Sequence, residues 1–209
     1  MGASLAIIWA AKAGADRSLY VSGLGADGEP TAGVFEFALL LLVAGGYSVA
    51  WALHDVVDGA GPVGRWTPSL SLIVSSSLFL VASQVPCTAG CPVPVGDSFT
   101  WQDLTHVASA IAGFAFAALA MIQVSFAGSH PVLSWLSRVC GVLVAVVAAA
   151  GGLSSLFSFR TDIGSMLEFV AMTVAMSWLA LTGLVTAVEG AEPVPKDAER
   201  NDLVGAGKR

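Results

Sequence analysis

The chain has 209 residues, of which 56% are hydrophobic and only 11% are charged, and its formal net charge is -6. A soluble domain carries charges on about a quarter of its residues, so this composition indicates an integral membrane protein. The acidic balance excludes the basic surface that nucleic-acid binding requires, and we expect no nucleic acid among its partners.

The first apolar segment, residues 2–15, is short for a membrane helix. At about 1.5 Å per residue it reaches roughly 20 Å, whereas the hydrocarbon core is roughly 30 Å thick. It has no basic residues ahead of its apolar run, and Lys12 follows that run, which is not typical of a signal peptide. We interpret it as a short first membrane helix, or as one that begins before Met1. The alternative is an amphipathic helix on the membrane surface.

Residues 19–30, which we name the glycine loop, form a polar connection between this segment and the next apolar run. Three glycines and Pro30 forbid a regular helix here. Glu36 follows a few residues inside the next run, where a carboxylate is costly unless it has a partner. The loop and Glu36 therefore predict a polar site at one end of the protein.

Five further apolar runs are long enough to cross a bilayer as helices. They occupy residues 34–53, 69–85, 105–127, 132–157 and 163–188. With the short first segment, they predict an all-α, polytopic membrane bundle of six helices over residues 1–190. Residues 191–209 are charged and contain two prolines, and we expect a disordered tail.

The distribution of Lys and Arg predicts the orientation, because cytoplasmic loops are enriched in both. With six spans, both termini lie on one side of the membrane. Six basic residues fall on that side: Arg65, Arg138, Lys196, Arg200, Lys208 and Arg209. The other side has Arg17 and Arg160, with Lys12 as a third residue if it is counted. Both termini and the tail are therefore predicted to be cytoplasmic, and residues 86–104 are predicted to face an oxidising space.

Cys87 and Cys91 lie in this outward loop, which its prolines keep from being helical. The pair predicts a disulfide, whose small ring would remove about 2 kcal/mol of unfolded-state freedom. The alternative is a redox pair, but thiol-exchange enzymes place two residues between the cysteines and this chain has three. Cys140 lies in an apolar run and is expected to be an inert packing residue.

The histidines do not predict a metal centre. His54, His106 and His130 include no pair at metal-ligand spacing on one helix, and the two cysteines have no nearby second pair. We therefore expect no metal site, no haem and no other cofactor.

Polar residues are predicted to gather at the outer ends of the helices, beneath the glycine loop. The candidate ligand-binding residues are Ser22, Glu36, Asp103, His106, Arg160 and Glu168. One interpretation is a structural clamp, in which carboxylates near helix starts pair with the few outer cations. The other is a pocket that recognises a lipid head group or another amphiphile.

Two short motifs resemble those of the DUF998 family, a family of six-helix membrane proteins from bacteria and archaea with no settled activity. They are Tyr20-x-Ser22-x-Leu24-Gly25-x-x-Gly28-x-Pro30 with Phe35, and Asp103-x-x-His106 with Gly113 and Phe114. The chain departs from the first motif at Gly23, where the family usually has an acidic residue. The resemblance implies the fold, and a multi-pass location in a bacterial or archaeal plasma membrane.

A looser similarity connects the chain to DRAM/Sfk-type eukaryotic membrane proteins. It rests on Ser22, Gly25, His106 and Glu168. Those proteins are linked to lipid remodelling, lipid asymmetry and autophagy, so this resemblance implies a role at membrane lipids.

Three functional hypotheses follow from these observations. The first is a non-enzymatic protein that binds membrane lipids or another envelope membrane protein through the outer polar layer. The second is an intramembrane lipid hydrolase or acyltransferase, with His106 as base, Asp103 as its orienter and Ser22 as nucleophile. The third is a small transporter, for which two glycine pairs give only weak support.

Overall fold

Six α-helices and two short 3₁₀ helices make up the described part of the protein. The structure is a computed structural model that describes residues 1–15, 19–54, 66–126, 131–157 and 161–191. The helices are α1 (Gly2–Ala13), η1 (Ser22–Gly25), α2 (Ala32–Ala52), α3 (Pro68–Gln84), η2 (Gly96–Ser98), α4 (Trp101–Val124), α5 (Pro131–Leu156) and α6 (Thr161–Ala191). The six-helix, all-α bundle predicted from the sequence is confirmed.

Threonine caps fix where two of the central helices begin. Thr67 accepts a hydrogen bond from the backbone N–H of Leu70 at 3.2 Å, and Pro68 occupies the first helical position. Thr100 accepts one from the N–H of Asp103 at 3.0 Å, so α4 begins at Trp101. The start at residue 105 that the apolar run predicts is wrong, because the Thr100 cap begins the helix four residues earlier. Asp103 consequently lies in the first turn of a helix rather than in a loop.

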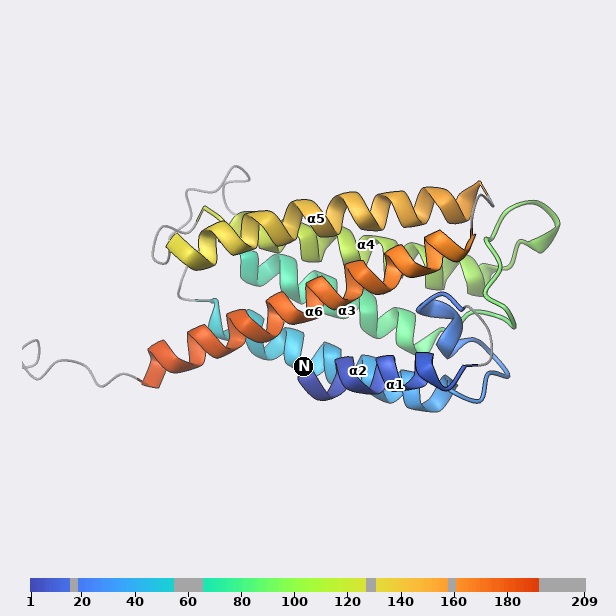
Figure 1. The fold of residues 1–209 in the computed structure, drawn as a ribbon, viewed down its shortest axis with the longest axis horizontal. Coiled ribbons are helices and arrows are strands. Elements are labelled where there is room, and N and C mark those ends of the chain that lie inside the picture. The colour runs from blue at the N-terminus through green and yellow to red at the C-terminus, as the bar shows by residue number, and fades with distance from the viewer. Residues whose placement is uncertain (16–18, 55–65, 127–130, 158–160, 192–209) are drawn as a thin grey trace, which may run out of the picture.

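Consecutive helices lie side by side, and α6 closes the bundle by packing against α5, α2 and α1 (Figure 1). Serine hydroxyls tie neighbouring helices together inside the bundle. Ser69 donates to the carbonyl of Ala50 at 2.7 Å, and Ser75 donates to that of Gly113 at 2.8 Å. Such bonds suit a bundle in lipid, where apolar surface alone gives helices little reason to associate.

Four of the described helices, α2, α4, α5 and α6, are long and apolar enough to cross a membrane. The protein is therefore a multi-pass membrane protein. The other two, α1 and α3, are apolar but have only 12 and 17 residues. The short α1 agrees with the sequence prediction. Helix α3 has the length of the predicted run 69–85, shifted by one residue, and reaches about 26 Å.

Exposed tryptophans mark the two ends of the bundle. At the first turn of α4, Trp101 is 75% exposed, whereas Trp51 and Trp135 lie toward the opposite end and are 84% and 65% exposed. Tryptophan is enriched where hydrocarbon meets head groups, so these side chains are consistent with two membrane interfaces. We call the end with Trp101, the glycine loop and residues 85–100 the disulfide end.

Several residues of the sequence predictions lie outside the described residues. They include Arg17 and Arg160 from the predicted outer layer, and residues 192–209 from the predicted tail.

Candidate functional site

A partly enclosed cavity of about 80 Å³ lies inside the bundle. Side chains from α1, α2, α3, α4, α6 and η1 line it, whereas α5 contributes none of the described lining residues. Most of the wall is apolar, with residues such as Phe35, Leu39, Phe114 and Met172. The lining on α4 extends from His106 to Met121, a rise of about 22 Å along the helix. The cavity is therefore long, narrow and mostly apolar.

Ser22, His106 and Glu168 are polar residues that line the cavity toward the disulfide end. They come from η1, α4 and α6 respectively, so three distant parts of the sequence converge here. All three are candidates predicted from the sequence, and the fold brings them to one cavity. A further lining residue, Ser75, is already bonded to Gly113 on α4.

Glu168 joins the glycine loop to α6. Its Oε2 accepts a hydrogen bond from the backbone N–H of Val21 at 2.9 Å, and the N–H and hydroxyl groups of Ser22 add further hydrogen bonds. Ser165, one turn earlier on α6, donates from its hydroxyl to the carbonyl of Leu19 at 2.6 Å. The loop is thereby held over the polar end of the cavity.

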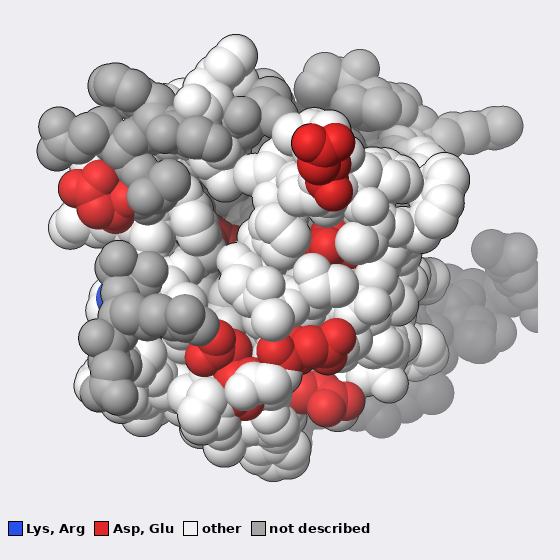
Figure 2. All heavy atoms as spheres, turned by 90° about the vertical axis from the view of Figure 1, so that its right-hand side faces the viewer, with Lys and Arg blue, Asp and Glu red and all other residues white. Residues whose placement is uncertain are grey.

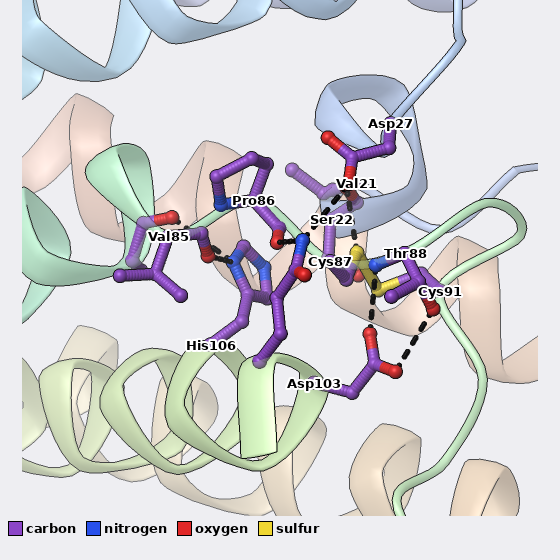
Figure 3. The surroundings of a disulfide bond; sticks show 12 residues. Val21, Ser22, Asp27, Val85, Pro86, Cys87, Thr88, Cys91, Asp103 and His106 are labelled. Atoms are coloured by element: carbon purple, nitrogen blue, oxygen red, sulfur yellow. Dashed lines mark hydrogen bonds between the residues drawn. A yellow bond between two sulfur atoms is a disulfide. The ribbon is translucent and has the colours of Figure 1, made fainter. Parts of the chain in front are cut away.

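His106 is buried and is oriented by the backbone of α3. Its Nδ1 lies 2.9 Å from the carbonyl oxygens of both Ala82 and Val85 (Figure 3). Carbonyl oxygens only accept, so Nδ1 carries a hydrogen, and in the neutral ring Nε2 then has the lone pair. The ring is therefore fixed in one tautomer by the last turn of α3.

Asp103 is fully buried but does not orient His106. Its carboxylate accepts hydrogen bonds from the N–H and hydroxyl of Thr88 at 2.8 and 2.9 Å, and from the hydroxyl of Thr100 at 2.5 Å. The dyad considered from the sequence, with Asp103 behind His106, is not formed, because these donors occupy the carboxylate and backbone carbonyls hold the imidazole Nδ1. Asp103 instead clamps the disulfide loop, residues 85–100, onto the start of α4.

Cys87 and Cys91 form a disulfide, as predicted, with Cα atoms 5.0 Å apart, and Cys140 is free. The loop around them contacts the glycine loop directly (Figure 3). The N–H of Asp27 donates to the carbonyl of Cys87 at 2.9 Å, and Gln102 donates to both Asp27 and the carbonyl of Pro86. The two loops therefore form one cover over the disulfide end.

The two sulfur atoms lie close to a possible third metal ligand. A nitrogen of His106 and the sulfurs of Cys87 and Cys91 all lie within 4.8 Å of one another. Because the sulfurs are bonded to each other, they do not offer the thiolates that a metal would need.

Glu36 lies apart from the cavity. Its side chain is exposed and accepts a hydrogen bond from the amide of Gln84 at 3.3 Å. The preceding residue, Phe35, points inward and lines the cavity, and the next residue on a helix points about 100° away. The predicted convergence therefore includes Ser22, His106 and Glu168 but not Glu36, and Arg160 lies outside the described residues.

Lys12 is a polar partner of Glu168 that is not among the site residues predicted from the sequence. Its ammonium group lies 3.6 Å from the ring centroid of Phe169 and interacts electrostatically with the neighbouring Glu168. The signal was present in the sequence, because an isolated lysine in an apolar helix usually has a partner inside the protein.

Acidic side chains gather on the surface of the disulfide end (Figure 2). The exposed acidic residues of this end include Asp27, Glu36, Asp97 and Asp162. Of the described basic residues, Arg138 lies at the opposite end, where its guanidinium group is 5.7 Å from the ring centroid of Phe126. The described charges are thus distributed unevenly between the two ends.

The sequence pattern of one family covers nearly the whole chain. It is described as Protein of unknown function (DUF998), and it matches residues 2–185. The chain belongs to the DUF998 family. The match covers α1 to α5 and α6 as far as residue 185, so all the residues that line the cavity lie within the DUF998 region. Comparison with curated proteins found no match, and comparison with solved structures found none either.

Proposed function

We propose that this DUF998 protein binds a membrane amphiphile in the central cavity and does not act as an enzyme. The observation that carries the proposal is the combination of a long apolar cavity with a polar end at Ser22, His106 and Glu168. Small-molecule binding sites are mostly apolar pockets with a few convergent polar groups, and the cavity of this protein is enclosed by membrane helices. An amphiphile from the bilayer matches both parts.

The hydrogen bonds at the polar end favour binding over catalysis. An enzyme of the kind considered from the sequence needs a nucleophile, a base and an orienting group that contact one another. Here Ser22 bonds to Glu168, and the carbonyls of Ala82 and Val85 hold His106. These partners fix the positions of the polar groups, which is what selective recognition of a head group requires.

Filling the cavity is expected to remove the bound amphiphile. Ala110 lines the cavity one helical turn after His106, so Ala110→Phe places a ring beneath the polar end. After purification in a mild detergent, the wild-type protein is expected to retain the amphiphile, and the variant is expected to retain about tenfold less of it. A tenfold decrease corresponds to a loss of about 1.4 kcal/mol of binding free energy. Native mass spectrometry with lipid extraction measures the amount of amphiphile bound to the wild type and to the variant.

Ala108→Phe is the matched control, because Ala108 lies on the exposed face of the same helix. It should retain the amphiphile like the wild type. Ala117→Leu, which fills the cavity about two turns deeper, is a second test if Ala110→Phe does not fold. Equal retention in the wild type and in a folded cavity-filling variant would overturn the proposal.

We also propose that the disulfide end faces outward from a bacterial or archaeal plasma membrane, with both termini in the cytoplasm. The Lys and Arg distribution supports this orientation. So does the disulfide, because such bonds persist in oxidising compartments.

This orientation is expected to give a one-sided labelling pattern. In a cysteine-free background, Asp97→Cys should react with an impermeant thiol reagent added to intact cells, whereas Arg200→Cys should react only after lysis. In the wild-type protein, mass spectrometry without reductant should find Cys87 and Cys91 bridged. The reverse labelling pattern would contradict the proposed orientation.

A further inference from the structure

The polar end of the cavity offers mainly hydrogen-bond acceptors. Because Nδ1 of His106 donates to the carbonyls of Ala82 and Val85, Nε2 of the neutral ring carries a lone pair. In this state Nε2 has no hydrogen to donate and can only accept a hydrogen bond. The tautomer follows from the two carbonyls and needs no assumption about the ligand.

Glu168 adds to this acceptor character. A carboxylate has about four lone-pair sites. Among the described residues, the donors that reach this one are the N–H of Val21 and the N–H and hydroxyl of Ser22. These described donors leave acceptor capacity on the carboxylate. The hydroxyl hydrogen of Ser22 is used in its bond to Glu168, so Ser22 has lone pairs left to offer.

Lys12 supplies the positive charge that this carboxylate needs. Its ammonium group interacts with Glu168 and packs on the ring of Phe169. A cationic ligand is therefore not required to balance the charge. An anionic head group, in contrast, would bring a second negative charge next to Glu168 and would find acceptors where it needs donors.

The dimensions of the cavity limit the apolar part of the ligand. A volume of about 80 Å³ has room for on the order of six water molecules. The lining on α4 nevertheless extends over about 22 Å between His106 and Met121. A long and narrow space of this kind fits one alkyl chain and excludes the paired chains of a phospholipid.

We infer that the cavity binds a neutral, single-chain amphiphile whose head group donates hydrogen bonds, of the chemical class of long-chain alcohols and monoacylglycerols. This inference rests on the proposed function and names its ligand class. The hydroxyl donates to Nε2 of His106 or to Glu168, and the chain extends along α4 toward Met121. A fatty acid of the same chain length is disfavoured.

The test compares head groups on one chain. Delipidated wild-type protein is titrated with dodecanol, dodecyl methyl ether and dodecanoate, and binding is measured by native mass spectrometry against Ala110→Phe in the same detergent. The ether carries a methyl group in place of the hydroxyl hydrogen of the alcohol, so it lacks the donor and keeps the oxygen and the chain. Dodecanol is expected to bind about tenfold or more tightly than either, because the other ligands leave buried acceptors unpaired.

Variants of two carboxylates test the same inference independently. Glu168→Gln puts a hydrogen-bond donor at the polar end of the cavity. It is expected to narrow the difference in affinity between dodecanol and dodecyl methyl ether. Glu36→Gln is the control, because Glu36 is exposed and lies outside the cavity, and it should leave the difference unchanged. The wild-type titration decides the question even if Glu168→Gln does not fold.

The outcomes separate this inference from the proposed function. Equal or tighter binding of the ether or the dodecanoate would overturn the head-group inference and leave a cavity that binds amphiphiles. If none of the three binds better to wild type than to Ala110→Phe, the proposed function fails and the inference with it.

Discussion

Asp103→Ala is expected to lower the free energy of unfolding by about 3 kcal/mol, because it removes a buried acceptor and leaves its donors without a partner. Those donors are the N–H and hydroxyl of Thr88 and the hydroxyl of Thr100. The side chain of Asp103 is 0% exposed, so water does not replace the lost bonds. The loss can be measured by equilibrium unfolding in mixed micelles of a mild detergent and dodecyl sulfate.

Two variants show whether the effect comes from these hydrogen bonds. Asp103→Asn keeps one acceptor oxygen, so its loss of stability should be intermediate. Asp97→Ala removes an exposed carboxylate from the disulfide loop and should change the free energy of unfolding by less than about 0.5 kcal/mol. If Asp103→Ala is as stable as Asp97→Ala, Asp103 does not clamp the disulfide loop.

The bundle was predictable because crossing a bilayer depends on length and composition, which are local properties of the sequence. The apolar runs correspond to α2, α4, α5 and α6 within a few residues. The largest error, at the start of α4, had a readable signal. Thr100 and Asp103 stand three residues apart ahead of an apolar run, the spacing of an N-terminal capping box.

Which residues face the cavity was much harder to predict, as Glu36 illustrates. In a soluble helix, polar residues mark the outer face, but lipid is as apolar as the protein interior. The residues around Glu36 are apolar on every side of α2, so their pattern did not reveal that Phe35 points inward and Glu36 outward. The carbonyl partners of His106 were equally hidden, because they depend on how α3 ends beside α4.

Close packing between the glycine loop and α2 leads to the other large expected effect. A Cβ atom on Gly25 would lie 2.5 Å from Cδ1 and 3.0 Å from Cε1 of Phe35. That ring is only 4% exposed and packs in a cluster with Leu24 and Phe169, so it has little room to move. Gly25→Val is therefore expected to cost about 3 kcal/mol of unfolding free energy by overpacking.

Gly33 provides the matched control, because a Cβ atom there would meet nothing within 4 Å. Gly33→Val should change the free energy of unfolding by less than about 1 kcal/mol, since only helix propensity changes. Replacing the ring of Phe35 with a smaller side chain tests the mechanism. Phe35→Leu in the Gly25→Val background should recover part of the lost stability, and such a non-additive result identifies residues in contact. If the double variant loses the sum of the two single effects, the clash with Phe35 is not the cause. Recovery would show that the glycine at position 25 is required so that the loop can pack against α2 at the polar end of the cavity.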